Sequence, residues 1–222
     1  MRNINRAGIG LAVGGLLVCI GGPMHPKGSM DSLDAHMITM LESPVWVVSH
    51  VIAMVGTVLI AVSLIVLSRS LEPRTLRPFV AVTAVGASLA AVEYLPHILA
   101  VTELDQLRAG EHAPITQTHE LIAALSGPVF GFGTALLAVA FAVTATRRRP
   151  LWWVIAIPAV LGGAAAGSAV PFVLVTRDVD MTVLFPGVAG MAIWFVVVGI
   201  VLARRSDKAT TPPPVQADLA VA

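Results

Sequence analysis

The sequence predicts an all-α protein, a six-transmembrane-helix bundle, and two observations carry this prediction. The first is composition: of 222 residues, 56% are hydrophobic and only 12% are charged, and the mean hydropathy is +0.86. Such values suit a chain in a bilayer and not a soluble domain. The second is that six separate apolar stretches are each long enough for a helix to cross about 30 Å of hydrocarbon.

These stretches cover residues 7–23, 44–67, 78–101, 116–143, 151–175 and 181–203. The first follows Arg2 and Arg6 as a signal peptide would, but no A-x-A cleavage site follows, so we expect a retained helix. Proline begins three stretches, where its missing N–H has no helical partner to lose: Pro44, Pro78 and Pro150. Prolines inside the stretches predict kinks, because neighbouring helices can satisfy the freed carbonyls: Pro96, Pro128, Pro158, Pro171 and Pro186.

The positive charges predict the orientation. With both termini in the cytoplasm, eleven of the 14 lysines and arginines fall on the inner side, and only Lys27, Arg108 and Arg177 fall outside. Inner loops of multi-pass proteins carry such an excess, so we expect a cell-membrane protein with its N-terminus and C-terminus cytoplasmic. The chain then divides into a six-span membrane domain (1–205) and a disordered cytoplasmic tail (206–222), whose apolar surface is too small to offset ordering.

Charge and cysteine content exclude several classes of function. Because 14 basic residues nearly balance 13 acidic ones, the chain lacks the excess that neutralises phosphate backbones, so nucleic-acid binding is not expected. The single cysteine excludes an internal disulfide and a CxxC metal site. The chain is expected to face the lipid bilayer as its main partner.

Small residues predict how the helices pack. Each GxxxG pair places two glycines one turn apart on one helix face, which lets backbones approach closely: Gly10/Gly14, Gly127/Gly131 and Gly163/Gly167. We expect these faces to pack within the chain, and a homo-oligomer through them stays an alternative. Trp46 and Tyr94 are expected at the outer boundary as interfacial anchors.

All six histidines fall on the predicted outer side. His50, His97 and His119 lie in three different spans, and at about 1.5 Å per residue each is within about 10 Å of the outer surface. The other three lie in the two outer loops: His25, His36 and His112. Three neighbouring helices thus present an imidazole at one level, and we expect these side chains to converge.

Carboxylates accompany these histidines. Glu93 precedes His97 by four residues and shares its helix face, and Glu120 follows His119 directly. A carboxylate inside a span needs a partner or a water-filled cavity, and the histidines suit it best. Histidine with carboxylate suits zinc or iron, and histidine with methionine suits copper. The candidate metal ligands are therefore His50, His97, His119, Glu93, Glu120, His25 and His36.

Three short motifs carry a resemblance to known sequences. The run HPKG (25–28), the WxxxH of Trp46 and His50, and the ExxxH of Glu93 and His97 resemble motifs of uncharacterised bacterial multi-pass membrane proteins. The resemblance covers about the first four spans. It implies the multi-pass architecture and no activity.

Four functions fit these observations. The first is a metal-binding site at the outer face; the second is a haem b site, with two of His50, His97 and His119 as axial ligands. The third is a small-solute or proton-coupled transporter in which Glu93 carries the proton, and the fourth is a scaffold held together by its polar cluster. No catalytic motif is recognised and no residue is assigned to catalysis, so a metal-dependent membrane hydrolase remains only a conceivable alternative.

Overall fold

The computed structural model describes residues 2–71, 74–146 and 151–208, and every regular element in these ranges is helical. The six long helices are α1 (Arg2–Met24), α3 (Trp46–Ser70), α4 (Arg77–Leu99), α6 (Pro114–Thr146), α7 (Leu151–Thr176) and α8 (Gly187–Lys208). All six are long and apolar enough to cross a membrane, which confirms the six-span, all-α prediction. Most of the predicted tail, from residue 209 onward, lies outside the described residues, as do Arg147–Pro150.

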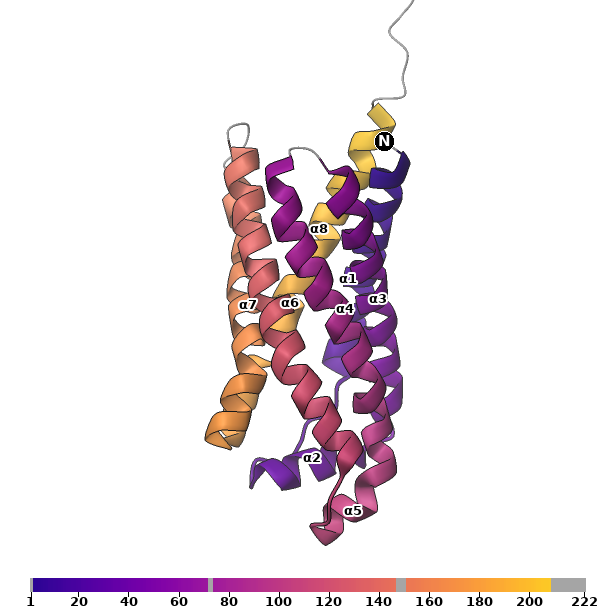
Figure 1. Cartoon of the computed structure of the whole chain (residues 1–222), viewed down its shortest axis with the longest axis vertical. Helices are drawn as coiled ribbons and strands as arrows, with labels where there is room; N and C mark the ends of the chain where they lie inside the picture. The colour runs from indigo at the N-terminus through magenta and orange to yellow at the C-terminus, as the bar shows by residue number, and fades with distance from the viewer. Residues whose placement is uncertain (1, 72–73, 147–150, 209–222) are drawn as a thin grey trace, which may run out of the picture.

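The long helices form a closed ring. Each packs against the next one along the chain, and α8 returns to pack against α1 (Figure 1). Buried apolar side chains fill the interior, and the largest fully buried ones include Leu11, Ile60, Leu64 and Phe195. Long helices that follow one another along the chain are therefore neighbours in space, so α3 packs against α4 and α4 packs against α6.

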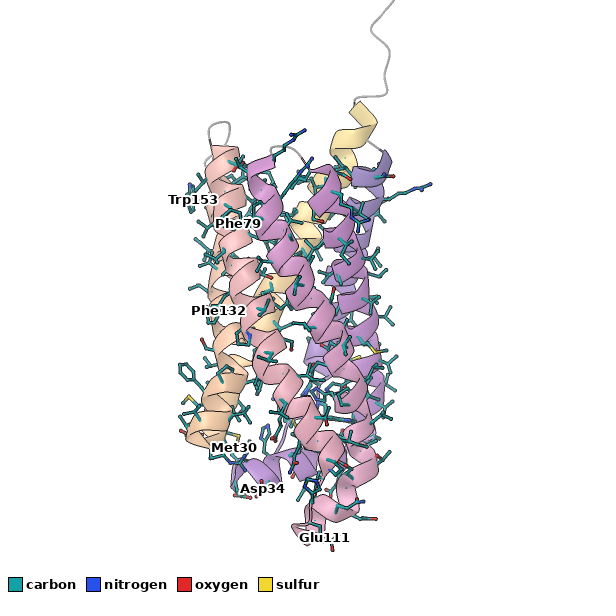
Figure 2. The ribbon with its side chains drawn as sticks, viewed as in Figure 1. Met30, Asp34, Phe79, Glu111, Phe132 and Trp153 are labelled. Atoms are coloured by element: carbon teal, nitrogen blue, oxygen red, sulfur yellow. The ribbon has the colours of Figure 1, made fainter. Side chains whose placement is uncertain are left out.

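The outward surface of the bundle is apolar. Figure 2 shows Phe79, Phe132 and Trp153 along its side, and each of them is exposed. In water such a surface would be unusual, but in lipid it is the favourable one. The exposed apolar side chains therefore agree with a multi-pass membrane protein.

Short elements gather at one end of the bundle. They include α2 (Leu33–Leu41), η2 (Ala100–Glu103), α5 (Leu104–Ala109) and η3 (Val179–Leu184). We call this the loop end, and we call the opposite end, where α1 begins and α8 finishes, the terminal end (Figure 1). Figure 2 shows Asp34 and Glu111 at the loop end.

The sequence did not predict α2 and α5, although their caps follow ordinary rules. The Ser32 hydroxyl accepts the Ala35 N–H at 3.1 Å and begins α2. Gly110 ends α5 with a φ of 68°, a left-handed conformation that glycine adopts without strain. Both helices are too short to span a membrane, so a search for long apolar stretches does not find them.

The last predicted span, 181–203, falls within the candidate membrane span Val179–Arg204, but it is not one continuous helix. Residues 179–184 form the 3-10 helix η3, and α8 begins only at Gly187. Pro186 therefore precedes the helix and does not kink it, because the proline lacks the N–H that a continuous helix would need there. Pro78, in contrast, lies in the first turn of α4 as predicted.

Glycines let neighbouring helices of this chain approach closely. A Cβ at Gly131 would lie 2.5 Å from the Gly163 carbonyl oxygen, and a Cβ at Gly14 would lie 2.6 Å from the Gly56 carbonyl oxygen. These GxxxG faces thus pack α6 against α7 and α1 against α3. A homo-oligomer through such a face stays a prediction.

Candidate metal centre

Four histidines and one glutamate gather at the loop end, from α3, α4, α6 and the residue that follows α1. His25 comes directly after α1, His50 lies early in α3, and His119 lies early in α6. Glu93 and His97 stand one turn apart near the end of α4. These residues form two groups that share His97, and in each group one ligand atom per residue lies within 4.8 Å of the others.

The first group contains His25, His50 and His97. The ring centroid of His50 lies 4.7 Å from that of His25 and 4.4 Å from that of His97. His50 is 2% exposed, whereas His25 is open to the outside along part of its surface. One exposed, one buried and one half-buried imidazole therefore lie close together.

An oxygen atom contacts the Nδ1 atom of each histidine in this group. His25 Nδ1 lies 2.8 Å from the Pro26 carbonyl oxygen, and His50 Nδ1 lies 2.5 Å from the Trp46 carbonyl oxygen. Because a carbonyl oxygen only accepts, these two nitrogens carry the proton, which leaves the lone pair on Nε2. His97 Nδ1 lies 2.9 Å from Glu93 Oε1, so the same tautomer suits it.

His50 has a buried ring nitrogen that no described residue pairs with. Its Nε2 atom is buried and finds no hydrogen-bond partner among the described residues. Buried polar atoms are nearly always paired, so an unpaired imidazole lone pair next to two other histidines needs an explanation. A bound cation would satisfy it.

Partial burial favours the neutral form of the His25 imidazole. The ring packs against His50 and stands 5.8 Å from the Trp46 ring, centroid to centroid. This partial burial holds the pKa of His25 below its ordinary value, with a smaller contribution in the same direction from His36, although the Pro26 carbonyl opposes it. His25 is therefore neutral at neutral pH.

The second group contains Glu93, His97 and His119. Glu93 Oε1 contacts the Nδ1 atoms of both histidines, and the two imidazole centroids are 3.9 Å apart. Glu93 is 8% exposed and His119 is 9% exposed. The glutamate is thus buried and partnered by histidines, as its position within a span requires.

The expected set of His50, His97 and His119 is divided between these groups. His97 stands in the middle, whereas His50 and His119 belong to different groups. The candidates His36 and Glu120 belong to neither. His36 Nδ1 instead contacts the Ser29 carbonyl oxygen at 2.9 Å, and Glu120 is half-buried on α6.

Two residues that support the site were not recognised from the sequence. Trp46 is 1% exposed and packs on His50 and His97, with ring centroids 4.0 Å and 4.9 Å away, so it is a wall of the site and not an interfacial anchor. Glu103 accepts the N–H groups of Ile115 and Thr116, each at 2.8 Å. A carboxylate suits the partial positive charge at a helix N-terminus, so Glu103 fixes the first turn of α6, just before His119.

Comparisons with protein-family models, with curated proteins and with solved structures find no match for this chain. The chemistry of the site is therefore inferred from its side chains alone. Neutral imidazole nitrogens and a carboxylate oxygen are ligands for divalent transition-metal ions such as zinc. The two groups could therefore hold a metal ion.

Proposed function

We propose that this protein is an integral membrane protein that binds a divalent transition-metal ion through Nε2 of His25, His50 and His97. The observation that carries the proposal is that each Nδ1 atom already contacts an oxygen, from Pro26, Trp46 and Glu93 respectively. Histidine ligands of metals almost always donate the other ring N–H to a carbonyl or carboxylate, which fixes the tautomer and the ring orientation. The three rings of this site already make such contacts through Nδ1.

The ligand set favours zinc. Three neutral histidines with a fourth position for water form a well-known zinc arrangement, and zinc prefers four ligands in a tetrahedron. Copper(II) accepts imidazole as well and binds such sites tightly, so it is the competing ion. Glu93 acts here by orienting His97 and raising the basicity of that ligand.

The spacing of the rings favours a bare ion over haem b. Two axial imidazoles on one haem iron hold their nitrogens about 4 Å apart across the porphyrin plane, so their ring centroids are farther apart still. The centroids of His50 and His97 are only 4.4 Å apart, and those of His97 and His119 are 3.9 Å apart. Such rings pack directly against each other and leave no slot for a porphyrin between them.

The distribution of polar groups favours binding over proton-coupled transport. Among residues whose burial is described, the buried carboxylates are Glu93 and Glu103, both toward the loop end. Hydroxyl groups deeper in the bundle form hydrogen bonds within their own helices. Those of Thr57, Thr83 and Thr134 each donate to the backbone carbonyl oxygen four residues earlier. No chain of ionisable side chains continues from Glu93 toward the terminal end within the described residues.

The proposed orientation places this site on the outer face of the cell membrane. Eleven of the 14 cations belong to the terminal end or to the segments that join helices there, three of them (Arg147–Arg149) outside the described residues. The positive-inside rule assigns that end to the cytoplasm. The histidines would then take their metal from the extracytoplasmic side.

Zinc binding by the purified full chain tests the proposal. The protein in detergent is stripped with a chelator, dialysed and titrated with zinc, and bound metal is measured by elemental analysis. His50→Gln should weaken binding by more than the roughly 10–100-fold that loss of an outer hydrogen-bond partner costs. His112→Gln, in an exposed loop, is the matched control and should bind as the unaltered chain does. Equal affinity of all three proteins, or no binding by the unaltered chain, contradicts the proposal.

A further inference from the structure

We propose that Glu93, His97 and His119 hold a second metal ion, and that the His97 ring bridges the two ions through its two nitrogens. This inference rests on the proposed function, because the first ion lies on the Nε2 side of His97. It changes the site from one ion with an orienting glutamate to a centre of two ions. Three observations support it: the ligand geometry, the contact between His119 Nδ1 and Glu93 Oε1, and the position of His97 in both groups.

The second group meets the requirements of a metal site. One carboxylate and two imidazoles offer ligand atoms that all lie within 4.8 Å of one another. Glu93 and His97 come from the last turns of α4, and His119 comes from the start of α6, whose N-terminus Glu103 holds. Glu93 and His119 are buried, and a dication would compensate the carboxylate charge inside a span.

The His119 nitrogen provides independent support. Nδ1 of His119 is buried and touches Glu93 Oε1, yet the two groups are not aligned as a hydrogen bond, and no other described residue pairs with that nitrogen. A simple ion pair would direct the imidazole N–H at the oxygen. A cation bound by both atoms would satisfy the His119 nitrogen and the carboxylate together.

His97 is the residue that joins the two groups. Its Nδ1 atom lies 2.9 Å from Glu93 Oε1, and its ring centroid lies 4.4 Å from that of His50. When the second ion binds, it displaces the Nδ1 proton of His97, which passes to the buffer, and the ring becomes an imidazolate. That anion and the Glu93 carboxylate then supply two negative charges against the four positive charges of two divalent ions.

Zinc stoichiometry at saturating metal distinguishes the two arrangements. We expect two ions per unaltered chain, one in His119→Gln, one in Glu93→Gln and one in His25→Gln. His36→Gln is the control and should bind two, because His36 belongs to neither group. Thermal unfolding in detergent shows which variants fold. If His119→Gln does not fold, Glu93→Gln replaces it as the test of the second ion.

Three results would overturn part of the picture. One ion per unaltered chain that is lost in His25→Gln and kept in His119→Gln overturns the second ion and leaves the proposed function intact. One ion that is lost in His119→Gln and kept in His25→Gln overturns the first site and with it the bridge. No bound zinc in the unaltered chain overturns both.

Copper tests the bridge itself. Two Cu²⁺ ions joined by an imidazolate are magnetically coupled, so the paramagnetic resonance signal of the copper-loaded chain should fall well below its copper content. In His119→Gln the signal should equal the copper content, because only one isolated ion remains. A full signal from two copper ions in the unaltered chain overturns the bridge.

Discussion

Glu93 and His97 lie one helical turn apart on α4, and Glu93 Oε1 lies 2.9 Å from His97 Nδ1. The carboxylate therefore fixes which edge of the imidazole faces the other histidines. Glu93 Oε1 also contacts His119 on α6. One buried oxygen atom thus connects two helices and sets the direction of a candidate ligand. This relationship makes Glu93 the most informative position for mutation.

Glu93→Gln should lower both metal affinity and stability. Glutamine keeps the shape but removes the charge that pairs with two imidazoles, so we expect zinc binding at the first site to weaken about 10–100-fold. Loss of the partnered charge should also lower the free energy of unfolding by about 1–3 kcal/mol. Calorimetric titration and thermal unfolding in detergent measure the two effects. Glu111→Gln, in the exposed loop after α5, should change neither; a raised unfolding midpoint in Glu93→Gln would contradict a partnered Glu93.

Glu103→Gln should destabilise the start of α6. The carboxylate accepts the N–H groups of Ile115 and Thr116 and the Thr116 hydroxyl, whereas one amide oxygen can replace only part of this cap. We expect a loss of about 0.5–2 kcal/mol, the usual range for a helix cap. Hydrogen exchange should show earlier opening at residues 114–119.

Asp105→Asn is the control for this change. Asp105 pairs with Arg108 at 3.0 Å on an exposed surface, and such pairs contribute little. If Asp105→Asn opens α6 as much as Glu103→Gln does, the cap has no special role.

Gly131→Ala should separate α6 from α7. The added Cβ would lie 2.5 Å from both the Gly163 oxygen and the Gly167 nitrogen, which are backbone atoms that cannot rotate away. We expect a loss of about 1–3 kcal/mol from overpacking, measured as thermal unfolding in detergent. Gly127→Ala is a matched control on the same face, because its nearest neighbour lies 3.6 Å away; equal losses in the two variants would argue against the close approach of these helices.

Reporter fusions should place the two ends of the bundle on opposite sides of the membrane. The cation distribution predicts that Arg77 and Arg149 lie in the cytoplasm and that Ser32 and Gly110 lie outside. A cytoplasmically active reporter should work at the first two positions, and a reporter that is active outside should work at the last two. An outside signal at Arg149 would reverse the predicted orientation and place the candidate metal centre toward the cytoplasm.

The sequence predicts the six spans well because lipid imposes one requirement on all of them. A backbone in hydrocarbon must satisfy its own hydrogen bonds, so a long apolar run has to be helical. The contact between Glu93 and His97 is predictable for a similar reason, since residues four apart share a helix face. Both inferences depend only on local geometry.

Other parts of the site depend on contacts between distant residues. His25 reaches the cluster from a loop, and nothing in its neighbourhood predicts that it meets His50 and His97 while His36 does not. Glu103 caps a helix that begins eleven residues later, so its role has no local signal. Even the expected convergence was incomplete, because His50 and His119 fall in two different groups that share only His97.

The closed ring has a consequence for biogenesis. α1 lies between α3 and α8. A Cβ at Gly15 would come within 2.6 Å of the Ala192 carbonyl oxygen on α8, so one face of α1 packs closely against α8. Synthesis from the N-terminus leaves that face exposed to lipid until every other span has been inserted. The histidines and Glu93, in contrast, all precede α7, and the helices that carry them are already neighbours by then. The candidate metal centre can therefore assemble before α8 completes the bundle.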